Sequence, residues 1–166
     1  MKILYQGSPG AYSHLAALEA YPQAEIISCK TFDECFNKAD EDEKIKIIIP
    51  ESNRITGNIG IEYLIFRHRL NIHAEHFHLI EHNLLGLPGS KLKDIKNVFS
   101  HGQALSQSSK FINDNNIIEN VRADTAGAAE LVAKSKKKSD AAIASSLSAK
   151  IYNLDILAPN IENEKG

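Results

Sequence analysis

Residues 2–14 read Lys-Ile-Leu-Tyr-Gln-Gly-Ser-Pro-Gly-Ala-Tyr-Ser-His: a short apolar run, a glycine-rich turn and the first residues of a helix-like segment. Other polar turns show the same order, each following an apolar run and opening a helix-like one, at 50–57, 100–103, 124–127 and 144–146. This alternation predicts an α/β fold with mainly parallel sheets and flanking helices. In such folds the carboxyl ends of the strands meet at one edge, where helix N-termini bind small anions.

Length and composition narrow the classes of function. The 166 residues suffice for one domain or two small lobes, and 43% of them are hydrophobic. The net charge of −2 gives no reason to expect a nucleic-acid partner. We expect no secretory signal and no membrane partner, because apolar runs such as Ile47-Ile48-Ile49 are far shorter than a signal-peptide core or a membrane span. Two cysteines, Cys29 and Cys35, fit free thiols in a reduced, cytoplasmic setting.

Three segments carry clear structural signals. Thr31 followed by Glu34 predicts a capped helix, whose core-facing stripe includes Cys35 and Phe36. The β-branched run at 45–50 predicts a strand buried on both faces. Residues 71–87 read as one or two extended strands, and the segment near 71–82 is interpreted as the boundary between two lobes.

Common catalytic motifs are missing. The sequence has no G-x-G-x-x-G, Walker A, G-x-S-x-G or H-E-x-x-H pattern, and it predicts neither a cofactor nor a metal. His76 and His78 would point to the same face of a strand and could chelate Zn²⁺. No carboxylate or cysteine stands nearby at ligand spacing, so a half-exposed strand with polar histidines is the preferred interpretation.

The polar turns, taken in order, resemble the catalytic domain of prephenate dehydratase. That family opens with Gly-x-Pro-Gly-x-x-Ser-His, which stands here at 7–14. Its Ser-Phe-x-x-x-Phe helix is similar to 31–36, and its Leu-x-Asp-Ile-x-x-Val-x-Ser-His-x-x-Ala-Leu stretch is similar to 92–105. Residues 124–129 and 141–145 also match, so the resemblance covers nearly the whole chain.

Two departures from the family pattern affect the expected chemistry. The family's Pro-Ile-Glu-Asn-Ser loop stands here as Pro50-Glu51-Ser52-Asn53-Arg54. Arg54 could fill the pocket or add a clamp for a carboxylate, and both alternatives stay open. The family's Thr-Arg-Phe motif, which carries its catalytic threonine, would lie just past Asn163. We therefore expect an incomplete catalytic domain or a protein without the usual acid.

The resemblance implies a lyase of phenylalanine biosynthesis that converts prephenate to phenylpyruvate, without a cofactor and as a homodimer. It also implies a two-lobed fold like that of type II periplasmic binding proteins, with a cleft between a first lobe at about 1–76 plus 155–166 and a second at about 77–154. The alternative is a non-catalytic module of the same fold that binds a small carboxylate. The predicted substrate-binding residues are Ser13, Asn53, Arg54, Thr56, Gly57, Ser100, His101, Gln103, Thr125, Ala126 (through its backbone N–H) and Ser145. For each hydroxyl in this set, a helix-capping role is an equal alternative.

Overall fold

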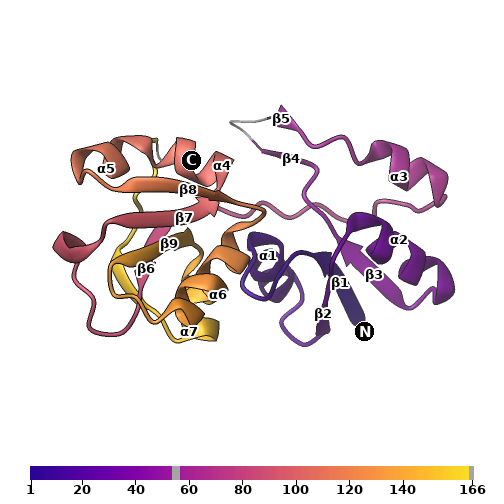
Figure 1. The fold of residues 1–166 in the computed structure, drawn as a ribbon. Helices are drawn as coiled ribbons and strands as arrows, with labels where there is room; N and C mark the ends of the chain where they lie inside the picture. Colours follow the sequence, from indigo (N-terminus) through magenta and orange to yellow (C-terminus); the bar gives the residue numbers. More distant parts are fainter. Residues whose placement is uncertain (54–56, 165–166) are drawn as a thin grey trace. The chain divides into compact units, whose positions relative to one another are not determined.

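A computed structural model describes residues 1–53 and 57–164. The chain forms two compact units (Figure 1). Unit 1 comprises Met1–Ser8 and Tyr12–His78, and unit 2 comprises Pro9–Ala11 and Leu79–Gly166. The predicted α/β class is confirmed, since each unit is a sheet with helices packed on it. Within the described ranges, no helix has the length and apolarity needed to cross a membrane.

Unit 1 is built on a parallel sheet with the strand order β2-β1-β3. These strands and the two helices that connect them are β1 (Lys2–Gln6), α1 (Tyr12–Ala20), β2 (Glu25–Cys29), α2 (Phe32–Glu41) and β3 (Ile45–Ile48). We expected the strand at 45–50 to be buried on both faces, and this is wrong. The strand lies at the sheet edge and its four residues are only half-buried, because the central position belongs to β1.

The predicted N-terminus of α2 is confirmed. The Thr31 hydroxyl accepts a hydrogen bond from the Glu34 backbone N–H at 3.1 Å, and the Glu34 carboxylate accepts one from the Lys30 N–H at 2.7 Å. Together these bonds satisfy N–H groups that a helix end otherwise leaves unpaired. Cys35 and Phe36 are fully buried, as the apolar stripe predicted.

The second half of unit 1 is less regular. It contains the short strands β4 (Ser52–Asn53) and β5 (Gly57–Asn58), which pair antiparallel, and the helix α3 (Glu62–Arg67). Residues 70–82 form neither helix nor strand, so the predicted strand over 71–87 is limited to β6 (Asn83–Gly86). Side chains rather than a strand ladder hold this segment, because His76 and His78 contact a residue of α1 instead of a neighbouring strand.

Unit 2 is built on a mixed sheet with the strand order β10-β6-β9-β7-β8. Besides β6, its strands are β7 (Asn97–His101), β8 (Ile118–Arg122), β9 (Asp140–Ala144) and β10 (Asp155–Ala158). Its helices are η1 (Leu92–Asp94), α4 (Gly102–Gln107), α5 (Ser109–Asp114), α6 (Thr125–Ser135) and α7 (Ser146–Tyr152). The strand β7 runs parallel to β8 and β9, whereas β6 is antiparallel to β9 and β10.

Alternate strand residues of unit 2 enter two separate cores. Leu84 and Val98 join the core that α4 and α5 cover, and their neighbours Leu85 and Phe99 join the core that α6 and α7 cover. The central strand β9 is therefore buried along its whole length, as expected for a strand with helices on both faces. This packing fixes the ends of β7, β8 and β9, where the candidate site lies.

The expected return of residues 155–166 to the first lobe is wrong. Instead β10 pairs with β6, Ile161 is buried in the core of unit 2, and the Ile161 N–H donates to the His82 carbonyl at 2.9 Å. The Asn163 side chain extends this attachment by donating to the Ser106 carbonyl and the Ser109 hydroxyl. Strand pairing and apolar burial thus assign this segment to unit 2.

Burial of His82 predicts that stability depends on pH. Its side chain is 3% exposed, its Nε2 lies 2.8 Å from the Gln107 Oε1, and burial lowers the pKa of its imidazole. Below about pH 6.5 the imidazole of His82 is protonated in the unfolded chain but stays neutral in the folded chain. The free energy of unfolding should therefore fall between pH 7.5 and pH 5.5. Urea unfolding at both values checks this. The fall should be smaller in His82→Gln, and an equal fall in both proteins would contradict the assignment.

Candidate functional site

Three polar turns meet at one edge of the unit 2 sheet. The strands β9, β7 and β8 are adjacent and parallel, and they lead into α7, α4 and α6 respectively. Their carboxyl ends therefore share an edge, which brings together six of the predicted site residues. These are Ser100, His101, Gln103, Thr125, Ala126 and Ser145.

Two of the predicted site hydroxyls, those of Ser100 and Ser145, donate hydrogen bonds within the protein. Ser100 is fully buried and donates to the Ile143 carbonyl at 2.6 Å, which links β7 to β9. Ser145 is 1% exposed, donates to the Gly10 carbonyl at 2.6 Å and accepts from the Ser148 N–H at 3.1 Å. Each hydroxyl has one proton, so neither donates to a ligand while these bonds hold. For Ser100 and Ser145 the structure therefore gives a structural role.

The bonds of Ser145 lead to a prediction about stability. Ser145→Ala removes the N-cap of α7 and the bond to the Gly10 loop, and we expect the free energy of unfolding to fall by about 1–2 kcal/mol. Urea denaturation followed by circular dichroism measures the loss. Ser146→Ala is the matched control, because Ser146 is exposed and should change stability by no more than about 0.5 kcal/mol. Equal losses in the two variants would contradict this reading of Ser145.

The end of β7 presents polar groups to solvent. His101 and Gln103 are exposed, and the His101 Nδ1 accepts a hydrogen bond from the Gln103 backbone N–H at 3.3 Å. A neutral imidazole that accepts at Nδ1 carries its proton on Nε2, so this nitrogen can donate to a ligand. His101 and Gln103 therefore combine exposure with suitable chemistry.

The N-terminus of α6 holds a carboxylate of the protein itself. Asp124 caps this helix, and its Oδ1 accepts from the Gly127 N–H at 2.6 Å. Thr125 is half-buried beside it, and Ala126 is fully buried. The Asp124 charge occupies the positive end of the helix dipole, so an anionic ligand there would face a like charge. Thr125 is consequently a stronger candidate for a ligand contact than the Ala126 amide.

Sequence reasoning missed a cation at this edge. Arg122 ends β8 directly opposite His101 of β7 and is exposed. Its guanidinium donates to the Val121 carbonyl at 2.8 Å and lies 4.9 Å from the centre of the Phe99 ring. That hydrogen bond uses one of five N–H donors, and an arginine is suited to carboxylate binding. Its position two residues before Asp124, which opens the polar turn at 124–127, was the signal that could have identified it.

Unit 1 carries the remaining predicted residues. Ser13 is half-buried in the first turn of α1, and Asn53 pairs with Gly57 in the β4–β5 ladder. Arg54 and Thr56 lie outside the described residues. The substrate contacts expected of these residues stay predictions.

His14 has a structural environment within unit 1. Its imidazole stacks on the Tyr5 ring with the ring centres 4.9 Å apart, and burial lowers the pKa of His14. The neutral ring is therefore favoured, as expected for a residue that packs against the sheet.

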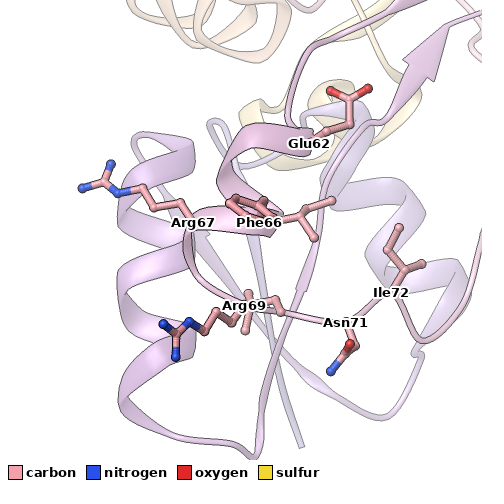
Figure 2. Close-up of a pocket in the computed structure, with 8 residues that line it drawn as sticks. Glu62, Phe66, Arg67, Arg69, Asn71 and Ile72 are labelled. Atoms are coloured by element: carbon pink, nitrogen blue, oxygen red, sulfur yellow. The ribbon is translucent and has the colours of Figure 1, made fainter.

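A hollow of about 670 Å³ lies on unit 1 (Figure 2). Its walls come from α3 and the segment after it, and among the residues that the structure describes they contain none of the predicted site residues. Arg67 and Arg69 stand at one side in Figure 2, with Phe66 and Ile72 among the apolar wall residues. Arg67 is partly engaged, because its guanidinium lies 3.7 Å from the Asp33 carboxylate.

Comparison with known proteins finds relatives over nearly the whole chain. Arogenate dehydratase/prephenate dehydratase 1 of Arabidopsis thaliana is 43% identical over 99% of this chain and 42% of its own length. A bifunctional N-acyl-homoserine lactone acylase/prephenate dehydratase of Komagataeibacter europaeus is 36% identical over 97% of this chain and 58% of its own length. The chain thus spans about two fifths to three fifths of these relatives.

A solved structure supports the fold. The crystal structure of prephenate dehydratase from Arthrobacter aurescens, in complex with L-Phe, aligns with a TM-score of 0.89. The alignment covers 99% of this chain and 57% of that one at 22% identity, which establishes likeness of fold. The family model for prephenate dehydratase matches residues 3–166. The chain belongs to the prephenate dehydratase family.

Proposed function

We propose that this chain is the substrate-binding part of an enzyme that converts prephenate to phenylpyruvate by decarboxylation and dehydration. The observation that carries the proposal is the match of the family model over residues 3–166. The polar edge of unit 2 supports it, since β7 and β8 end there with exposed groups suited to a small dicarboxylate. The reaction needs no external oxidant, because loss of carbon dioxide and water makes the ring aromatic.

Each candidate residue has a task in this chemistry. Arg122 pairs with a carboxylate and fixes its orientation. The Nε2 of His101 and the side chain of Gln103 donate hydrogen bonds to the second carboxylate or to the leaving hydroxyl. Fixed neutral donors favour the departure of hydroxide without a strong base. Exclusion of water from the carboxylate that leaves as carbon dioxide lowers the barrier further.

We also propose that turnover requires a Thr-Arg-Phe segment. The 166 residues contain no such sequence, and the family resemblance assigns the proton donor to its threonine. The chain as given should bind prephenate without turning it over. A chain that continues through Thr-Arg-Phe should produce phenylpyruvate at a steady rate.

The direct test measures phenylpyruvate formation and prephenate binding in both chains. Turnover only in the extended chain supports the proposal. Binding without turnover in either chain favours the non-catalytic carboxylate-binding module, and absence of both overturns the proposal. Arogenate should be assayed in parallel, because the Arabidopsis relative is named for both substrates.

Arg122 provides a sharper test of the site. In the extended chain, Arg122→Gln should raise KM for prephenate about 10- to 100-fold, the effect of losing a charge-assisted hydrogen bond of about 1.5–3 kcal/mol. Arg67→Gln is the matched control, since it removes the same charge from α3 of unit 1 and should leave KM within about twofold. Equal KM values for the two variants would exclude Arg122 from substrate binding.

A homodimer is proposed as the assembly. Tyr63 and Phe66 lie one turn apart on α3 and are 66% and 85% exposed, which supports an apolar contact with a second copy. Sedimentation equilibrium should give twice the chain mass, and Phe66→Lys should shift it toward the monomer. An unchanged mass for Phe66→Lys would move the interface away from α3.

A cytoplasmic location is proposed as well. The two cysteines, Cys29 and Cys35, are free and buried, which suits a reducing compartment. Fluorescence microscopy of a fusion made from the complete gene tests this. Enrichment in an organelle would contradict the proposal, and the Arabidopsis relative named above is described as chloroplastic.

A further inference from the structure

Three side chains of types that bind metals meet on unit 1, whereas the residues proposed for the reaction belong to unit 2. Glu19 comes from α1, while His76 and His78 come from the irregular segment at 70–82. The Glu19 Oε2 lies 3.1 Å from the His76 Nε2 and 2.8 Å from the His78 Nδ1. One ligand atom from each residue lies within 4.8 Å of the other two.

The donor set suits zinc. Two imidazole nitrogens and one carboxylate oxygen form a common three-residue set, which leaves a fourth position for water. Zinc lies about 2.0–2.2 Å from such atoms, so neighbouring ligands of a tetrahedral site are about 3.3–3.5 Å apart. The Glu19–His76 and Glu19–His78 distances need to lengthen by about 0.3 Å and about 0.6 Å to reach that value.

Exposure leaves the cluster open to a metal and to its water. The side chains of His76, His78 and Glu19 are 31%, 14% and 47% exposed. Hydrogen bonds from His78 and His76 lower the pKa of Glu19, so the carboxylate is ionised at neutral pH. In the absence of metal, the same geometry is a hydrogen-bonded pair of histidines on one carboxylate.

We propose that Glu19, His76 and His78 bind one Zn²⁺ ion, with water completing a tetrahedral site. The ion takes the place of the imidazole protons that now face the Glu19 carboxylate. It joins α1 to a segment without strand pairing, and therefore stabilises unit 1 by mass action. This inference is independent of the proposed reaction, which uses no metal.

Zinc titration of the untagged chain tests the proposal. Isothermal titration calorimetry should give one Zn²⁺ per chain, and zinc should raise the midpoint of thermal unfolding. Glu19→Gln, His76→Gln and His78→Gln should each weaken binding at least tenfold. His73→Gln is the matched control, because His73 is an exposed histidine of the same segment outside the cluster and should leave affinity unchanged.

A measurement on the unmutated protein keeps the test independent of variant folding. Nitrogen-detected NMR of the imidazoles should show zinc-induced shifts at the His76 Nε2 and the His78 Nδ1, the atoms that face Glu19. Shifts confined to other histidines, or no binding up to millimolar zinc, would overturn the proposal. Equal affinity in Glu19→Gln and the unmutated chain would overturn it too.

Discussion

Gly10→Ala should lower the free energy of unfolding by about 2–4 kcal/mol. Gly10 has φ +95, a conformation that L residues with a side chain rarely adopt. A Cβ at this position would lie 2.5 Å from the Ser148 Oγ and 2.9 Å from the Ser148 Cα. The Cα belongs to α7 and cannot rotate away, so the loop or the helix must move.

That movement would break a set of bonds. The Gly10 carbonyl accepts from Ser145 at 2.6 Å and from Ser148 at 3.0 Å, and the neighbouring Pro9 carbonyl accepts from the Tyr152 hydroxyl at 2.8 Å. The Pro-Gly pair of the family motif therefore attaches its loop to α7 in unit 2. Its role is structural whether or not the loop also contacts substrate.

Gly60→Ala is the matched control for the steric term. Gly60 has φ +78, but a Cβ there meets no atom within 4 Å. Gly60→Ala should therefore lower the free energy of unfolding only by the cost of the left-handed backbone conformation, about 1–2 kcal/mol. Urea denaturation of both variants measures the difference, and equal losses would show that contact with α7 contributes nothing at Gly10.

Phe36→Ala should destabilise unit 1 by about 3–5 kcal/mol. Phe36 is a fully buried residue of α2, and its ring packs against the His68 imidazole with the ring centres 5.3 Å apart. Truncation leaves a cavity, and it also exposes a histidine that now contacts the Asp40 carboxylate at 2.5 Å. The larger sheet of unit 1 has three strands, and Tyr5 on its central strand is the other large aromatic side chain described as fully buried in this unit.

An exposed phenylalanine gives the control for this second substitution. Phe77 is 90% exposed, so Phe77→Ala should change the free energy of unfolding by no more than about 0.5 kcal/mol. Thermal or urea unfolding at low protein concentration checks both. A loss below about 1 kcal/mol for Phe36→Ala would mean that α2 does not cover a packed core.

Local signals in the sequence identified much of the fold. The Thr31–Glu34 cap and the apolar stripe of α2 were predictable because neighbours along a helix decide them. The burial of β3 could not be predicted in this way, since the same β-branched run fits a central or an edge strand. Likewise, the position of β10 beside β6 depends on pairing across distant parts of the chain.

The candidate site divides in the same way. Polar residues after strands pointed to the edge where β7, β8 and β9 end, because parallel strands must present their carboxyl ends together. Only the tertiary contacts showed that the hydroxyls of Ser100 and Ser145 donate hydrogen bonds to the carbonyls of Ile143 and Gly10 respectively. Arg122 became a candidate once strand register set it opposite His101.

By itself, the sequence determined the α/β class, the family and the turns that carry polar chemistry, since these follow from local periodicity and ordered motifs. Tertiary structure alone decided which hydroxyls are already bonded and which distant side chains share a site. Glu19 lies 57 residues before His76 in the chain, yet the two side chains are 3.1 Å apart. Sequence spacing carries no information about such a contact, because packing of the whole unit determines it.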